Sequence, residues 1–171
     1  LAVTVVLGAL SIAAPAWCED DDQRRAEIVL AIKEKRRDDA RMLLDEALRA
    51  ASQANKPQRL GRFELFRAEL EAEKPTDKTL EYARAAMLHL ESAPEAKLAG
   101  LRYHVSGAQV TIAKERLGAA AFHLQEARAV VAKLPEPGAD AKAPDPGSTD
   151  VARDLTRLAD VERALMAALR K

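Results

Sequence analysis

The chain has one cysteine, Cys18, and no net charge. A single cysteine excludes an intrachain disulfide in any compartment, so the fold must be stabilised by packing alone. Its 27 lysines and arginines are balanced by 27 aspartates and glutamates. A balanced charge argues against nucleic acid or an anionic membrane surface as the main partner.

Sequence signatures of catalysis are also missing. There is no glycine-rich phosphate loop and no paired-cysteine metal motif, and Ser106 lacks the leading glycine of a nucleophile elbow. His123 and Glu126 share one helical face, a spacing that a metal site can use. The Glu-x-x-His sequence of di-metal bundles, however, does not occur. We therefore predict no enzymatic activity and no cofactor, with a metal-handling or redox protein built on the histidines as the least favoured alternative.

The first 18 residues differ in composition from the rest of the chain. Residues 1–14 are almost wholly apolar and uncharged, and small residues follow as far as Ala16. This pattern is typical of a secretory signal peptide that is cleaved after Ala16 or after Cys18. It predicts a periplasmic or secreted protein. Because the positively charged start of such a peptide and the initiator methionine are absent, we expect the sequence to be truncated at its beginning.

Two alternatives to cleavage stay open. A membrane anchor needs about 20 apolar residues, and this run is slightly short unless residues are missing upstream. A lipoprotein would be acylated at Cys18, although the bulky Trp17 before it fits a lipobox poorly. Contact with a membrane is expected only if the N-terminal segment is retained.

The rest of the chain has the pattern of an all-α domain. Its few glycines and prolines fall between periodic segments, and Pro57, Pro94 and Pro135 divide residues 19–134 into three units. Each unit is interpreted as two helices. Between residues 23 and 54 only a charge inversion, Arg36-Arg37 followed by Asp38-Asp39, indicates a turn, so one uninterrupted helix is the alternative.

The turns of the other two units are marked by residue type. In the second unit, residues 73–77 interrupt the periodicity, and Thr76 or Asp77 can cap the following helix. In the third unit, Gly118 supplies the predicted turn. The sequence therefore predicts six helices before residue 135.

A stripe of small, large and small side chains recurs at long range. The residues of each stripe lie on one face of a helix, and their small side chains let a neighbouring helix approach closely. A degenerate copy with a small residue in place of leucine occurs in the second unit. The repetition indicates stacked helical hairpins. The stripes comprise Ala40, Leu44 and Ala47; Thr79, Ala83 and Ala86; and Ala120, Leu124 and Ala127.

The C-terminal part differs again. Residues 135–148 contain four of the eight prolines and no large apolar residue, which predicts a flexible loop. Thr149 or Asp150 is the expected cap of a last helix, over residues 149–171. This helix is expected to cover the exposed end of the stack with one apolar face. The apolar residues of that face are Val151, Leu155, Leu158, Leu165 and Leu169.

Residues 23–134 resemble the tetratricopeptide-repeat family. The resemblance is carried by the stripes that begin at Ala40 and Ala120, by the turn residues Asp38 and Gly118, and by the prolines that follow. The spacings exceed the family's usual 34 residues, and the first unit lacks the large aromatic near its start. The resemblance implies a right-handed solenoid of three hairpins with a C-terminal capping helix. An ordinary helical bundle with alanine-rich seams is the alternative.

The resemblance also implies a function. It predicts a non-enzymatic interaction module that binds a peptide or helix of another envelope or secreted protein in a groove lined by the first helix of each hairpin. Arg25, Arg102 and Gln109 then point into the groove, with Glu64 and Glu71 at the matching positions of the second unit. Arginine is suited to gripping a carboxylate of the partner bidentately.

Two other interpretations apply to the same residues. The five predicted groove residues can be ordinary solvated side chains. The whole chain can be a small periplasmic helical-bundle binder or chaperone without a groove, which acts through its surface or its loop.

Overall fold

The computed structural model describes residues 17–91, 93, 95–134 and 146–170. The fold of these residues is all-α, as predicted, and it contains seven helices and no strand. The predicted signal peptide lies outside the described residues up to position 16, and Cys18 belongs to the first helix. The helices are α1 (Trp17–Lys33), α2 (Arg37–Gln53), α3 (Pro57–Glu71), α4 (Asp77–Leu90), α5 (Glu95–Ala113), α6 (Leu117–Val131) and α7 (Pro146–Ala168).

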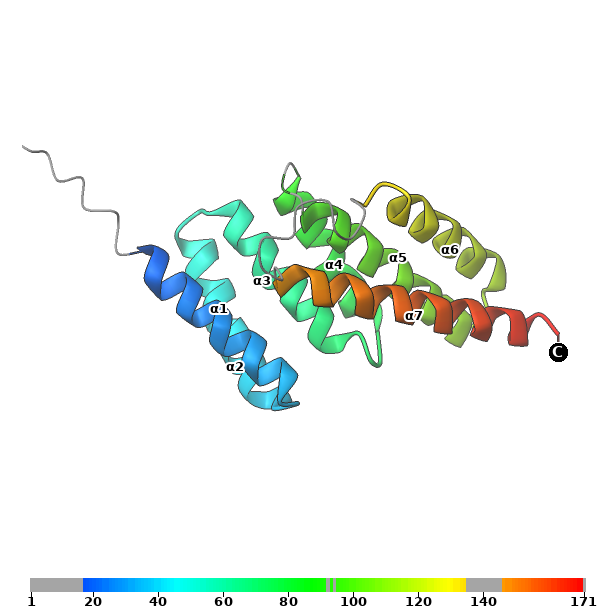
Figure 1. Cartoon of the computed structure of the whole chain (residues 1–171), viewed down its shortest axis with the longest axis horizontal. Coiled ribbons are helices and arrows are strands. Elements are labelled where there is room, and N and C mark those ends of the chain that lie inside the picture. Colours follow the sequence, from blue (N-terminus) through cyan, green and yellow to red (C-terminus); the bar gives the residue numbers. More distant parts are fainter. Residues whose placement is uncertain (1–16, 92, 94, 135–145, 171) are drawn as a thin grey trace, which may run out of the picture.

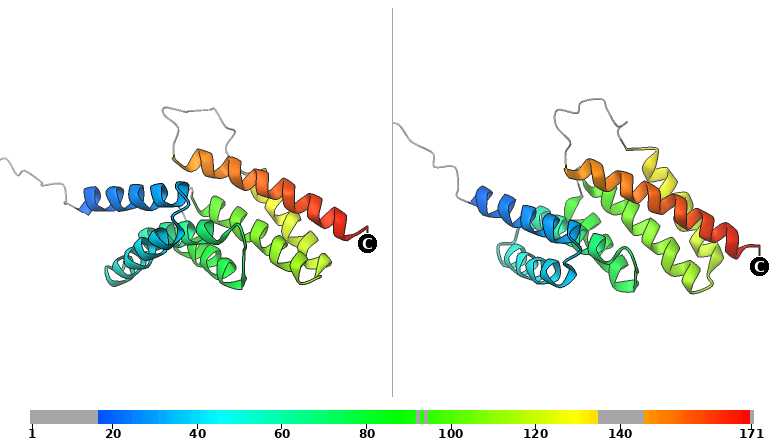
Figure 2. Two further views of the ribbon diagram at one scale, coloured as in Figure 1. Left: turned by 90° about the horizontal axis from the view of Figure 1, so that it is seen from below. Right: turned by 60° about the horizontal axis from the view of Figure 1, so that its bottom comes forward.

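Helices that follow one another in the chain lie side by side (Figure 1). The pairs α1–α2, α3–α4 and α5–α6 correspond to the three predicted two-helix units, and α2–α3 and α4–α5 contacts join the units. Helix α7 leaves this series because it packs against both α5 and α6. Figure 2 shows α7 running along the outside of the last pair. Among the described helices, none is long and apolar enough to cross a membrane.

Three helix ends share one backbone geometry. Lys35, Asn55 and Glu115 have positive φ angles of 59°, 51° and 57°. The residue after each donates its backbone N–H to the carbonyl five residues earlier, which is the Schellman motif. These bonds satisfy carbonyl groups that the helix end would otherwise leave unpaired. They run from Arg36 to Ala31 (2.9 Å), from Lys56 to Ala51 (3.2 Å) and from Arg116 to Thr111 (2.8 Å).

Two predicted turn residues lie inside helices instead. The helix break of the first unit is at Lys35, and Asp38 is in the first turn of α2. The break of the third unit is at Glu115, and Gly118 is in the first turn of α6. The prediction from Gly118 was wrong because a lysine or glutamate at positive φ gives no compositional signal, whereas glycine is the residue usually found there.

The turn before α4 was predicted correctly. Thr76 is its N-cap, with an extended backbone, and Asp77 is the first residue of the helix. The Thr76 N–H donates to the hydroxyl oxygen of Thr79 over 2.9 Å. Because Thr79 is fully buried, this bond anchors the start of α4 to the interior.

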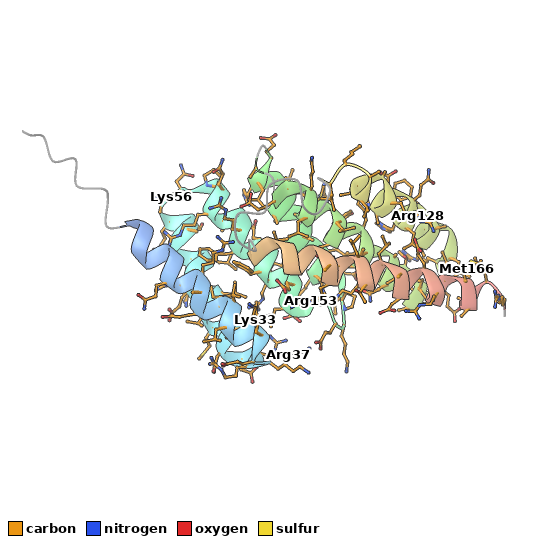
Figure 3. The ribbon with its side chains drawn as sticks, viewed as in Figure 1. Lys33, Arg37, Lys56, Arg128, Arg153 and Met166 are labelled. Atoms are coloured by element: carbon orange, nitrogen blue, oxygen red, sulfur yellow. The ribbon has the colours of Figure 1, made fainter. Side chains whose placement is uncertain are left out.

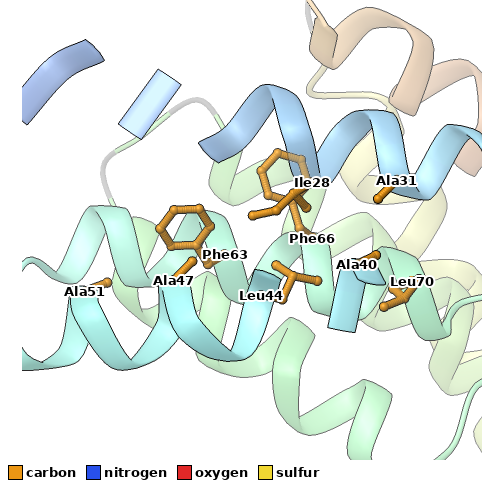
Figure 4. Close-up of a cluster of buried hydrophobic side chains, with 9 residues drawn as sticks. All are labelled: Ile28, Ala31, Ala40, Leu44, Ala47, Ala51, Phe63, Phe66 and Leu70. Carbon is orange, nitrogen blue, oxygen red and sulfur yellow. The ribbon is translucent and has the colours of Figure 1, made fainter. Parts of the chain in front are cut away.

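The small-residue stripes form the seams between helices. All nine predicted stripe residues are buried, eight of them completely. In the N-terminal half, α1, α2 and α3 enclose one apolar cluster around Leu44, with Phe63 and Phe66 filling the space beside the alanines (Figure 4). A second cluster joins α5, α6 and α7.

Glycines inside helices allow two further close approaches. A Cβ atom on Gly61 of α3 would lie 2.8 Å from Cγ of Leu90 in α4. A Cβ atom on Gly107 of α5 would lie 2.7 Å from the imidazole ring of His123 in α6. The prediction that glycines fall only between helices was therefore wrong, because close packing offsets the cost of about 1 kcal/mol for glycine in a helix.

The last helix begins earlier than predicted. Helix α7 starts at Pro146, so residues 146–148 of the predicted loop are helical, as are Thr149 and Asp150. Residues 135–145 lie outside the described residues. A proline suits the first helical position because its fixed φ angle is already helical and the N–H it lacks would have no partner there.

The buried face of α7 was only partly predicted. Leu158 and Leu165 are buried, as expected, whereas Leu155 and Leu169 are 37% and 59% exposed. Positions 154, 158, 161 and 165 form the buried stripe, which therefore begins with a charged residue, Asp154.

Candidate functional site

The five predicted groove residues do not share one environment. Glu64 of α3 accepts a 2.7 Å hydrogen bond from His89 of α4, and burial raises the pKa of this carboxyl while His89 opposes the rise. Glu71 of α3 pairs with Arg41 of α2 over 3.1 Å. Both glutamates thus face neighbouring second helices. Arg25 of α1 is half-buried.

The two predicted residues of α5 are both drawn into the interior. Gln109 is half-buried, and its amide oxygen is buried with no hydrogen-bond partner among the described residues. Arg102 is only 2% exposed. The structure therefore places Arg102 inside the protein, where we had expected a residue that faces a partner.

The Arg102 guanidinium joins three helices. Its Nε donates to Oδ2 of Asp154 in α7 over 2.8 Å, and its Nη1 donates to the carbonyl oxygen of Leu65 in α3 over 3.1 Å. Its Nη2 lies 3.4 Å from Oε2 of Glu69, also in α3. Both carboxylates are almost wholly buried. Buried charges are tolerated when they are paired, and each of these three charges has a partner of opposite sign.

Two arginines of α7, Arg153 and Arg157, pair with the same two carboxylates. We define the Arg102 cluster as Glu69, Arg102, Arg153, Asp154 and Arg157. Arg153 pairs with Glu69, and its side chain is 40% exposed. Arg157 pairs with Oδ1 of Asp154 over 3.1 Å. Each carboxylate is therefore shared by Arg102 and one arginine of α7.

An apolar contact continues from the Arg102 cluster along α7. Leu158, Val161 and Leu165 follow Asp154 on one helical face and pack against α5 and α6. A solvent-exposed ion pair between Arg128 of α6 and Glu162 lies beside this contact, with 2.7 Å between its atoms. Figure 3 shows Arg153 and Met166 along α7, with Arg128 on the neighbouring α6. The side of α7 that faces the hairpins thus has a charged beginning and an apolar end.

Two histidines form a separate contact between α5 and α6. Nδ1 of His104 lies 3.3 Å from Nδ1 of His123, and the Tyr103 ring meets both imidazoles edge-on. Burial lowers the pKa of both histidines, and the charge of His123 lowers that of His104 further, against the opposing charge of Glu126. The neutral pair can share one hydrogen bond. In the part of the chain that the structure describes, no group of three or more candidate ligands could hold a metal ion.

The histidine pair predicts a pH-dependent stability. Because the folded state lowers both pKa values below their ordinary 6.5, the unfolded state takes up protons first as the pH falls. The stabilising contribution is complete above pH 6.5 and is lost as the pH falls through the folded pKa values. We expect denaturant unfolding to show a smaller loss of stability from pH 7.5 to pH 5 in the variant that combines His104→Gln with His123→Gln.

A control for this prediction is His89→Gln, which removes a histidine whose ring bonds to Glu64. This variant is expected to keep the part of the pH dependence that comes from His104 and His123. Equal pH dependence in the wild-type chain and the double variant would contradict the assignment.

Sequence reasoning singled out Arg102 but missed its partners. Glu69 lies between Ala68 and Leu70, and the apolar pattern of α3 gave no sign that its carboxylate is buried. Asp154 could have been found, since it precedes Leu158, Val161 and Leu165 on one helical stripe. A charged residue on an otherwise apolar stripe predicts a buried ion pair when a neighbouring helix offers a residue of opposite charge.

Comparisons with known proteins identify no relative of this chain. No family model, no curated protein and no solved structure matches the chain.

Proposed function

We propose that the chain is a non-enzymatic protein–protein interaction module that is exported and binds a peptide or helix of another envelope or secreted protein. The expected binding surface follows from the resemblance to tetratricopeptide repeats. It places partner recognition on the side of the molecule formed by α1, α3 and α5, the first helices of the three pairs.

One observation carries this proposal. Helix α7, which lies outside the series of paired helices, is held against α5 by a carboxylate that Arg102 binds over 2.8 Å. The hairpins thus already bind a helical segment through an arginine that was expected to grip a partner's carboxylate. Amphipathic helices that lay an apolar face on a hydrophobic surface are a common form of recognition.

Other features agree with a binding role. Export is supported by the apolar run of residues 1–14 and the small residues after it. The zero net charge favours a protein partner over nucleic acid. Glu64, His104 and His123, whose pKa values are shifted, are engaged in contacts between helices, which is a structural use.

The test uses the exported protein in its native cell. Arg25 is a predicted groove residue that lies outside the Arg102 cluster, and it is half-buried on α1. We expect Arg25→Ala to weaken crosslinking to the partner while the melting temperature stays unchanged. The matched control is Arg49→Ala, an exposed arginine of α2 that loses the same charge on a second helix.

The outcomes are distinct. Crosslinking that is reduced by Arg25→Ala and retained by Arg49→Ala supports a binding surface on the first helices. Crosslinking that survives both substitutions and fails when residues 135–145 are replaced by a glycine–serine linker of equal length, which leaves α7 intact, would place binding in that segment. The chain would then be a binder without a groove.

A further inference from the structure

We propose that α7 is a resident ligand on a helix-binding face, and that this face accepts an amphipathic helix of a partner protein in its place. The face comprises Glu69 of α3, Arg102, Leu101 and Val105 of α5, and Leu124 of α6. The accepted helix carries an aspartate followed by apolar residues four, seven and eleven positions later. This inference rests on the proposed function and names the class of partner.

The polar part of the face is already organised by the hairpins. Two of the three Arg102 nitrogens are directed at α3, at the Leu65 carbonyl oxygen and at Glu69. Its Nε is directed at Asp154 of α7. Because α3 orients the guanidinium, a carboxylate that arrives on another helix meets a donor already in position. Such preorganisation reduces the entropy lost on binding.

The apolar part of the face sets the spacing of the accepted helix. Leu158, Val161 and Leu165 are at most 7% exposed and occupy the surface of α5 and α6. They lie four, seven and eleven residues after Asp154, so all four side chains share one side of a helix. Face and ligand therefore match in both charge and spacing.

The buried charge also explains why the contact is selective and exchangeable. Replacing both Arg102 and Asp154 with apolar residues would avoid the desolvation cost of the pair and hold α7 at least as well, since apolar replacements of buried ion pairs are often neutral or stabilising. The ion pair lowers that affinity but discriminates against helices that lack a carboxylate. The outer ion pair of Arg128 with Glu162 is partly exposed and contributes little.

The connection to the hairpins gives α7 its advantage over a partner. Residues 132–145 join α6 to α7, so the resident helix competes at the high effective concentration of a tethered ligand. Weakening the resident helix should therefore raise the affinity for the same helix supplied as a separate molecule.

The probe is a fluorescent peptide with the sequence of residues 146–171. We expect it to bind the full chain carrying Asp154→Asn about tenfold or more tightly than the wild-type chain, because the variant's own α7 competes less well. The full chain with Leu165→Ala weakens α7 without leaving a buried charge unpaired and should show the same direction. Anisotropy titrations measure both, with circular dichroism to confirm folding.

Matched peptides test the role of the carboxylate. A peptide with Asp154→Asn is expected to bind about tenfold more weakly than the unchanged peptide, because Arg102 loses its charged partner. A peptide with Asp160→Asn loses the same charge at an exposed position and should bind like the unchanged one. Equal affinities of all three peptides would overturn the assignment of Arg102 as the selective group.

Two further results would overturn the proposal. If both full-chain variants stay folded and bind the peptide no better than the wild-type chain, α7 is a permanent part of the fold. If this happens while Arg25→Ala still weakens crosslinking in cells, the interaction module stands and only the resident-ligand idea fails. A concentration-dependent wild-type dimer that the peptide dissociates would make a second copy of the chain the occupant.

Discussion

The Arg102→Ala chain is expected to lose about 3–5 kcal/mol of its free energy of unfolding, because removing one partner leaves buried charges uncompensated. Among the described residues, the substitution leaves Asp154 with Arg157 as its ion-pair partner, and it takes a donor from the Leu65 carbonyl oxygen. Both lost interactions lie in the interior, where water cannot replace them. Urea unfolding monitored by circular dichroism measures the loss.

This expectation replaces the simpler one from the sequence. An arginine that lines an open groove could be changed to alanine without altering the melting temperature, whereas Arg102 is 2% exposed and joins α3, α5 and α7. A loss below about 1 kcal/mol would mean that water reaches the Arg102 cluster, since exposed ion pairs contribute only about 0–1 kcal/mol.

Two control variants separate charge from packing. Arg84→Ala removes an exposed arginine of α4 and is expected to change stability by no more than about 0.5 kcal/mol. Combining Arg102→Met with Asp154→Leu replaces both charges with apolar groups and should recover most of the stability lost by Arg102→Met alone. Glu69 retains Arg153 as its partner in that chain. If the double variant does not regain this stability, the contacts of Arg102 with α3 contribute more to the free energy of unfolding than its pair with Asp154.

The all-α fold and its seams were predictable because they depend on local periodicity. Ala40, Leu44 and Ala47 recur with helical spacing, and a stripe of that kind must be buried against a neighbouring helix. The helix breaks were less predictable. Lys35 and Glu115 adopt positive φ angles that neither residue type favours, because the Schellman bonds at the helix end stabilise that geometry.

The candidate site was harder to predict because its contacts are distant in sequence. Arg102 bonds to Leu65 and Asp154, 37 and 52 residues away along the chain. A charged residue at helical spacing is normally interpreted as part of a solvated face, and only the packing of α7 on α5 reverses that interpretation. Residue types therefore indicated an arginine suited to a carboxylate but not that the carboxylate belongs to the same chain.

The second large effect is expected at the seams. Replacing Ala47 or Ala127 with leucine should lower the free energy of unfolding by about 1–3 kcal/mol each, because the larger side chain overpacks a tight contact. Ala47 is fully buried in the cluster of α1, α2 and α3, and Ala127 is fully buried in that of α5, α6 and α7. The loss at Ala127 should also loosen α7, which packs on the same cluster. Thermal and urea unfolding measure both variants.

Ala129→Leu provides the matched control in α6, since Ala129 is exposed two residues after Ala127. Leucine and alanine are both strong helix formers, so the control should change stability by no more than about 0.5 kcal/mol. An equal loss for Ala127→Leu and Ala129→Leu would show that the helix itself and not the seam is sensitive. If Ala127→Leu alone is destabilising, and it also raises the affinity for the peptide of residues 146–171, the seam of α5 and α6 and the docking of α7 depend on the same packed surface.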